Sequence, residues 1–168
     1  MKLAMKWFFP IMFTAMALAF ISEQVALVLG FEPPPQDLVK LFTDPNVAWH
    51  IKAKFAAVAV LLAPVLEEII FRMGLFRFFV WLGKRIRKEK AKASGRKATF
   101  PPVASLMSGA VFAAVHLHAA TFLPLWFLGV AFAWLYWRSG TLLSPIFCHF
   151  MFNLMNLILC LIIGNKIV

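Results

Sequence analysis

Charged residues are scarce in this chain, and acidic residues are the scarcest of them. Of its 168 residues only 14% are charged, with 7 Asp and Glu against 17 Lys and Arg. A soluble domain is usually about a quarter charged and about half apolar, whereas this chain is 62% hydrophobic, with a mean hydropathy of +0.85. Too little polar surface is available to cover a soluble globule. The composition therefore indicates an all-α, polytopic transmembrane helical bundle, expected to form one membrane-embedded domain over residues 1–168.

Several familiar catalytic patterns are also missing. Residues 116–120 and 149–153 do not supply the His-Glu-x-x-His of a zinc protease. The only two aspartates lie in a polar loop, which excludes an aspartyl pair within the apolar runs, and the serines of those runs lack a Gly-x-Ser-x-Gly context. The two cysteines, Cys148 and Cys160, would be roughly 18 Å apart on one helix, too far for a disulfide.

Five apolar runs are present instead, at residues 7–31, 51–82, 101 to about 120, 122–137 and 142–163. About 20 residues cross a bilayer, so we expect about five spanning helices. The first run continues past a plausible signal-peptide cleavage site, which favours an uncleaved span. Residues 37–42 predict a short interfacial helix in the polar loop between the first two runs.

Most of the net charge of +10 is concentrated in residues 84–97, between the second and third runs. The positive-inside rule places this segment, and with it the N-terminus, in the cytoplasm. A basic segment at that position contacts anionic lipid headgroups. The positive charge therefore points to the lipid bilayer as a partner and not to nucleic acid.

Two carboxylates and a guanidinium lie inside the second apolar run: Glu67, Glu68 and Arg72. Charge inside hydrocarbon is costly, so such groups usually face a protein interior and mark a functional site. On a helix Glu68 and Arg72 are four residues apart and share a face. Glu67 is rotated by about 100° from Glu68. We therefore expect Arg72 to neutralise Glu68 and to leave Glu67 free.

Two later runs carry polar residues at a comparable depth. The helical rise gives the distance of each residue from the cytoplasmic end of its own helix. This distance is roughly 21 Å for Glu68 and roughly 22 Å for His116. It is roughly 12 Å for His149 and roughly 18 Å for Asn153. His149 and Asn153 share a helix face, as do Phe112 and His116. This coincidence predicts one shared site, formed by three helices.

The residue types suggest hydrolysis. Glu67 could act as general base on a water, helped by His116, while His149 and Asn153 could donate hydrogen bonds to an oxyanion. Three alternatives remain at this stage: an ion- or proton-coupled transporter, a silent scaffold, and a zinc-dependent version of the enzyme using both histidines and a glutamate. No cofactor is predicted, with a divalent metal such as zinc kept open.

Three motifs occur in order, each on its own apolar segment, and together they resemble the CPBP family of intramembrane proteases. This family is also called the type II CAAX prenyl endopeptidase and bacteriocin-processing, or Abi, family. The resemblance covers about residues 53–160 and includes the segment at residues 138–145, which precedes the last motif. The motifs are Glu67-Glu68-x-x-x-Arg72, Phe112-x-x-x-His116 and His149-x-x-x-Asn153.

The resemblance implies a helical membrane fold and peptide-bond hydrolysis by a glutamate-activated water. By motif position its site comprises Glu67 and His116 as the water-activating pair, His149 and Asn153 as oxyanion donors, and Glu68 and Arg72 as ordering residues. The implied substrate is a membrane-anchored protein or peptide. This chain is shorter than many members, and it resembles small bacterial sorting enzymes of the inner membrane that cut C-terminal anchors from surface proteins.

Overall fold

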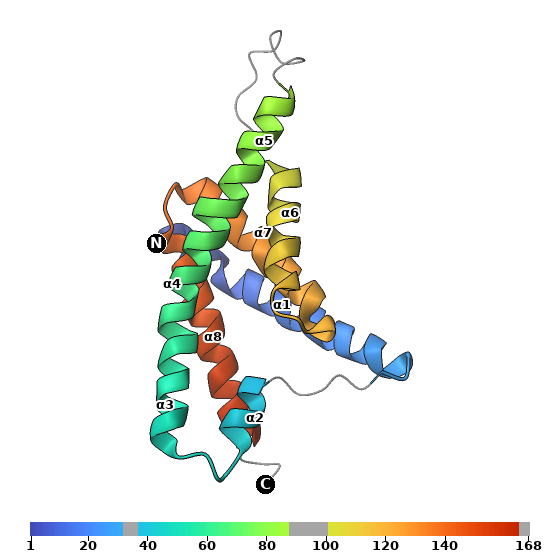
Figure 1. Cartoon of the computed structure of the whole chain (residues 1–168), viewed down its shortest axis with the longest axis vertical. Helices are drawn as coiled ribbons and strands as arrows, with labels where there is room; N and C mark the ends of the chain where they lie inside the picture. The colour runs from blue at the N-terminus through green and yellow to red at the C-terminus, as the bar shows by residue number, and fades with distance from the viewer. Residues whose placement is uncertain (32–36, 88–100, 165–168) are drawn as a thin grey trace.

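The computed structural model describes residues 1–31, 37–87 and 101–164, and every regular element in these ranges is a helix (Figure 1). Two helices precede the long central one: α1 (Lys2–Val28) and α2 (Asp37–Thr43). The latter confirms the short helix predicted at residues 37–42. After the central helix come α6 (Pro102–Ala114), the 3-10 turn η3 (Ala119–Thr121), α7 (Phe122–Ser139) and α8 (Leu143–Gly164).

The central helix runs without a break over residues 49–87 but switches to π-helical hydrogen bonding in two places. Its parts are α3 (Trp49–Ala57), the π-helical η1 (Val58–Leu62), α4 (Ala63–Glu68), the π-helical η2 (Ile69–Phe76) and α5 (Arg77–Arg87). π-Helical turns are rare and occur frequently at functional sites. Here the two π segments flank α4, which ends with the two glutamates.

The first π segment leaves one carbonyl group open to an outside donor. In η1 the N–H of Ala63 bonds five residues back, to Val58 O. Pro64, which would continue this register to Ala59 O, has no N–H. The carbonyl of Ala59 thus lacks the backbone donors that would ordinarily serve it, and it is free to accept a bond from a neighbouring helix.

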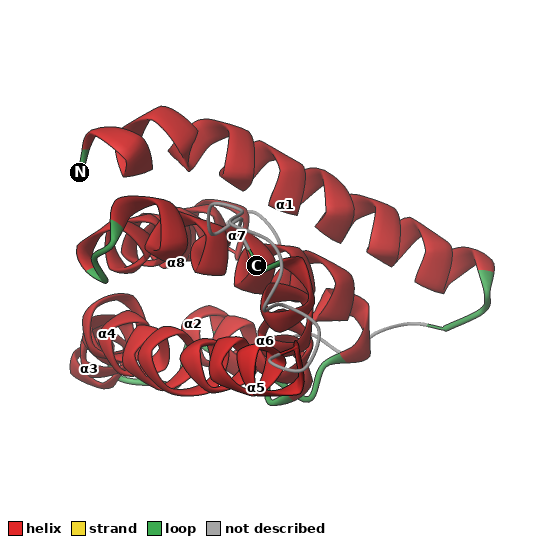
Figure 2. Ribbon diagram, turned by 90° about the horizontal axis from the view of Figure 1, so that it is seen from above, coloured by secondary structure: helices red, strands yellow, loops and turns green. Residues whose placement is uncertain are grey.

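The helices form three layers (Figure 2). α1 packs along α7 and α8; on the opposite side, the central helix packs on α8 and α6 packs on α7. An apolar core fills the space between α1, α7 and α8, where Phe8, Met12, Leu128, Phe132 and Leu135 are all buried. The site residues of α8 therefore point away from α1 and toward α4.

α6 and α7 approach each other closely at a pair of glycines. A Cβ atom added to Gly129 would lie 2.6 Å from the Cα of Gly109. Small residues allow helix backbones in membranes to approach in this way. Near the same crossing the indole N–H of Trp126 donates to Leu106 O at 3.0 Å.

By length and composition, 3 of the described helical segments could cross a membrane: Lys2–Val28, Ala119–Ser139 and Leu143–Ile162. The sequence predicted a third span from residue 101 to about 120, and the C-terminal boundary of this prediction is wrong. α6 ends at Ala114, and the chain turns at Leu117, whose φ of 53° is left-handed. A left-handed residue stops the α-helical hydrogen-bond pattern. Most of the predicted basic segment, residues 84–97, lies outside the described residues.

Candidate active site

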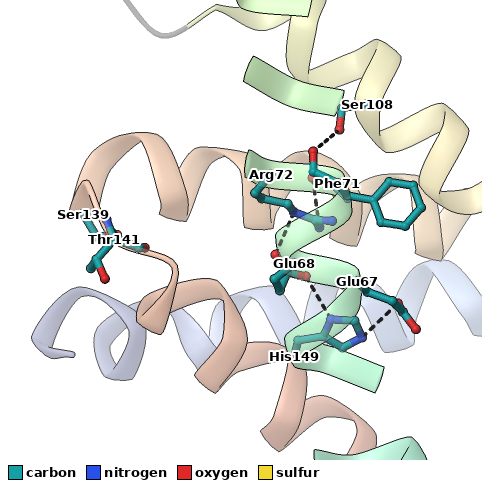
Figure 3. Close-up of polar contacts among 9 residues, drawn as sticks. Glu67, Glu68, Phe71, Arg72, Ser108, Ser139, Thr141 and His149 are labelled. Carbon is teal, nitrogen blue, oxygen red and sulfur yellow. Dashed lines mark hydrogen bonds and ion pairs between the residues drawn. The ribbon is translucent and has the colours of Figure 1, made fainter. Parts of the chain in front are cut away.

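Glu68 and Arg72 form an ion pair in the interior of the protein (Figure 3). Arg72 Nε lies 2.8 Å from Glu68 Oε2, and both side chains are fully buried. The helical spacing of four residues brings them together, as the sequence predicted. Removing two opposite charges from solvent is tolerable only with close pairing, so each group depends on the other.

Aromatic rings surround the guanidinium of Arg72. Its Cζ lies 4.9 Å from the ring centre of Phe112 and 5.4 Å from that of Phe132. Phe71 packs edge-on against Phe112, with ring centres 5.1 Å apart. Arg72 also donates from Nη2 to Gly129 O, at 3.5 Å. The glycine crossing of α6 and α7 thus presents both aromatic faces and a backbone carbonyl to the arginine.

His149 lies between the two glutamates (Figure 3). Its Nδ1 is 2.9 Å from Glu68 Oε1, and its Nε2 is 3.7 Å from Glu67 Oε2. Because Glu68 is paired with Arg72 and ionised, we assign a proton to Nδ1, which donates it to Glu68. Phe132 and Phe112 hold the ring from two sides, with ring centres at 5.2 and 5.9 Å. This fixes Nε2 toward Glu67.

The two adjacent carboxylates have different surroundings. Glu68 has no exposed surface and uses one oxygen for Arg72 and the other for His149. The side chain of Glu67 keeps 27% of its surface exposed, and its Oε2 is the atom that faces His149. At 3.7 Å this contact is too long for a direct hydrogen bond. Glu67 is accordingly the carboxylate that retains room for another group.

Asn153 faces the central helix, one turn beyond His149 on α8. Its Nδ2 donates to Ala59 O at 2.9 Å. That carbonyl is the one left open by the π turn and by Pro64, so the side chain of Asn153 completes the hydrogen bonding of the central helix. The amide has a second N–H, which this bond does not use.

His116 is placed differently from the expectation. It follows the end of α6 in a turn, where its side chain is exposed. The sequence placed it deep within a span beside Glu67. Its Nδ1 instead contacts Phe112 O at 2.7 Å, and its ring packs on that of Phe112 at 4.9 Å. His116 thus reaches the site through Phe112, which also contacts His149 and Arg72.

The sequence interpretation missed several residues that support the site. Ala59, Gly129 and Phe132 each contribute a carbonyl or a ring, and Ser108 donates from Oγ to Phe71 O at 3.2 Å. Two signals were available. A proline in mid-helix frees a carbonyl upstream of it, and single glycines within apolar helices indicate close crossings. The sequence holds no comparable signal for which residue of a neighbouring helix each of these groups contacts.

The donor atoms of this site do not fit a catalytic zinc ion. Such a site takes three protein ligands, and the described residues include no group of three or more His, Cys, Asp or Glu side chains that could hold a metal. Both oxygens of Glu68 and the Nδ1 of His149 are already used within the site. Only Glu67 and His149 Nε2 remain there, so no step below is assigned to a metal.

An all-α bundle with apolar helices of spanning length and a buried cluster of charges defines an integral membrane protein with an internal polar site. The family model described as Type II CAAX prenyl endopeptidase Rce1-like matches residues 49–155, and the chain belongs to this family. It is a family of proteases, and the matched range contains every site residue discussed above. No significant match was found among the curated proteins or the solved structures.

Proposed function

We propose that the chain is an intramembrane endopeptidase that hydrolyses a peptide bond of a membrane-anchored protein or peptide by a glutamate-activated water. The observation that carries this proposal is the position of Glu67. It is the partly exposed carboxylate of the site, and its Oε2 faces His149 Nε2 at 3.7 Å. Glu67 Oε2 is itself buried and has no hydrogen-bond partner among the described residues, and an unpartnered buried oxygen of this kind suits a catalytic role.

The charges of the site support a shared proton. Glu67, Glu68 and Arg72 together carry one net negative charge, and one further proton makes the buried cluster neutral. Neutral clusters are favoured away from water. With Nδ1 of His149 donating to Glu68, that proton belongs to the pair formed by Glu67 and His149 Nε2. It supplies a base and an acid at the same place.

The proposed reaction uses this pair twice. Glu67 takes a proton from water as the water oxygen bonds to the amide carbon, and the C=O electron pair moves to the oxygen. Protonated His149 Nε2 and the second N–H of Asn153 stabilise that oxyanion. The proton on Glu67 then passes to the amide nitrogen as the C–N bond breaks. Arg72 pairs with Glu68, and Glu68 in turn holds His149 in place through its Nδ1.

His116 belongs to this proposal as a second group at the rim. Its ring packs edge-on against Phe112, which contacts both His149 and Arg72. From this position it can meet a substrate that reaches Glu67 and assist the activation of water. The resemblance of the motifs to those of small bacterial sorting enzymes supports a role in removing C-terminal anchors from surface proteins at the bacterial inner membrane.

The test is Glu67→Gln, which keeps the shape of the side chain and removes the base. Loss of a general base costs about 10²–10⁴-fold in rate. Membrane proteins of cells expressing the wild type or the variant are compared by quantitative proteomics, and shortened species should require Glu67. Glu23→Gln is the matched control, because Glu23 is an exposed residue of α1. Equal shortening with Glu67→Gln would overturn the proposal.

The same variants separate the proposal from proton transport. Purified protein in liposomes is exposed to a pH jump, and the internal pH is followed with a dye. A peptidase of this kind gives no flux above empty liposomes. A flux that disappears in Glu67→Gln, in a protein that shortens no membrane species, would favour the transporter instead.

A further inference from the structure

A cavity lies between η2, α5 and the end of α7, and none of the site residues above lines it. Its volume is about 730 Å³. Small-molecule sites are typically about 300–1,000 Å³. The cavity is therefore large enough for a headgroup and the first part of an acyl chain.

Two cations line this cavity from one face of α5. Arg77 and Lys84 are seven residues apart, with Trp81 between them at the position of the intervening turn. This spacing places all three on one side of the helix. Both cations are exposed, and the described residues of the lining include no carboxylate. The lining thus has an uncompensated positive charge.

Aromatic side chains form much of the remaining wall. Phe76 is buried and packs edge-on against Tyr136 and Trp137, with ring centres at 6.2 and 6.4 Å. Phe78 and Trp81 are about half exposed, and their ring centres are 6.0 Å apart. Tyrosine and tryptophan are enriched at the level of lipid headgroups in membrane proteins. The wall therefore suits the boundary between headgroup and hydrocarbon.

Two further cations neighbour residues of the lining. The guanidinium of Arg85 lies 5.4 Å from the ring centre of Trp81. Arg138 is exposed and stands in the chain between the lining residues Trp137 and Gly140. Basic pockets between transmembrane helices are typical sites for anionic lipid headgroups.

We propose that this cavity binds one phospholipid with an anionic headgroup. Arg77 and Lys84 hold the headgroup phosphate, and the acyl chain lies against the exposed apolar side chains of Met73, Phe78 and Trp81. These apolar side chains favour a lipid over a free phosphate, which would match only the cations. The site is independent of the proposed peptidase reaction.

A bound lipid would also contact the segment that positions the ion pair. Met73 and Gly74 line the cavity and directly follow Arg72 in η2. Packing against them stabilises the π-helical segment that holds the partner of Glu68. The anionic lipid is accordingly expected to raise the melting temperature of the purified protein more than a zwitterionic lipid with the same chains does.

Native mass spectrometry tests the proposal with phosphatidylglycerol and phosphatidylcholine of identical acyl chains. The wild type should retain one phosphatidylglycerol in preference to phosphatidylcholine. Each basic residue near an anionic headgroup contributes about fivefold in affinity, so the double variant Arg77→Gln, Lys84→Gln should lose about 25-fold. The control double variant Lys2→Gln, Lys6→Gln removes the same charge from exposed positions of α1. An equal loss in both would overturn the proposal.

Two further measurements test the occupant. A Cβ added at Gly74 meets its nearest neighbour, Ile69 O, only at 3.9 Å. Gly74→Leu should therefore fill the cavity and lower retention of both lipids, while an unchanged melting temperature of the delipidated protein shows that it folds. Full retention in this variant would contradict the site. Displacement of the lipid by soluble glycerol phosphate, or by a soluble acidic peptide, would show that the occupant is not a phospholipid.

Discussion

The crossings of α6 with α7 and of α4 with α8 lie side by side but are made in different ways. At the first, Gly109 and Gly129 bring two backbones into direct contact. At the second, Glu67 and Glu68 meet His149, and Asn153 meets a backbone carbonyl. The apolar crossing provides a rigid frame, and the polar crossing carries the candidate chemistry. The two are joined by Arg72, which pairs with Glu68 and contacts Gly129 O and Phe112.

The largest effect on stability is expected from Arg72→Met, which breaks the link between the crossings. It leaves the Glu68 carboxylate buried without its cation, and removal of one partner of a buried pair costs about 3–5 kcal/mol. Unfolding of the purified protein in mixed detergent micelles measures this loss.

The double variant Glu68→Gln, Arg72→Met sharpens the result, because it removes the uncompensated charge and should recover part of the stability. Lys54→Met is the control, since Lys54 is exposed on α3. If Arg72→Met unfolds at the same denaturant concentration as the control, the ion pair does not support the fold.

The next largest effect is expected from Gly129→Ala, which breaks the apolar crossing. The new Cβ would lie 2.6 Å from Gly109 Cα, so the helices must separate. Overpacking of this kind costs about 1–3 kcal/mol. Gly83→Ala is the matched control, because nothing lies within 4 Å of a Cβ there. A stable Gly129→Ala protein would show that the crossing is looser than the structure has it.

A smaller effect on stability is expected from Asn153→Ala, within the polar crossing. It removes the bond to Ala59 O, and interhelical hydrogen bonds in membranes contribute about 0.6–2 kcal/mol. Asn156→Ala removes the same side chain from an exposed position of α8 and serves as control. Under the proposed function, the rate of substrate shortening should fall more than the stability loss explains. A rate that tracks the folded fraction would leave Asn153 a structural residue.

The smallest effect is expected from Ser108→Ala. Ser108 Oγ donates to Phe71 O from α6, so its loss weakens the contact of η2 with the frame by about 0.6 kcal/mol. Ser105 is also buried, but its hydroxyl bonds within its own helix, to Pro102 O at 2.8 Å. Ser105→Ala should therefore be closer to neutral. The reverse order in an unfolding assay would contradict the role of the interhelical bond.

The fold class, the family and the pairing of Glu68 with Arg72 could all be predicted from the amino-acid sequence. Composition decides whether a chain can cover itself with polar surface, and helical spacing decides which close neighbours share a face. Both properties can be evaluated from the sequence without knowing how the helices pack. The same helical spacing predicted that His149 and Asn153 share one face of their helix, and both contact the central helix.

The contact partner of each of these residues depends on how the helices pack in three dimensions. His149 contacts both glutamates, whereas His116 lies in a turn after α6 and reaches the site only through Phe112. Leu117 is left-handed just beyond the end of α6, and such a conformation at a leucine has no sequence signal. The open carbonyl of Ala59 and the contact of Gly109 with Gly129 depend on how separate helices cross. These crossings are set by side chains far apart in the chain, so spacing along one helix could not predict them.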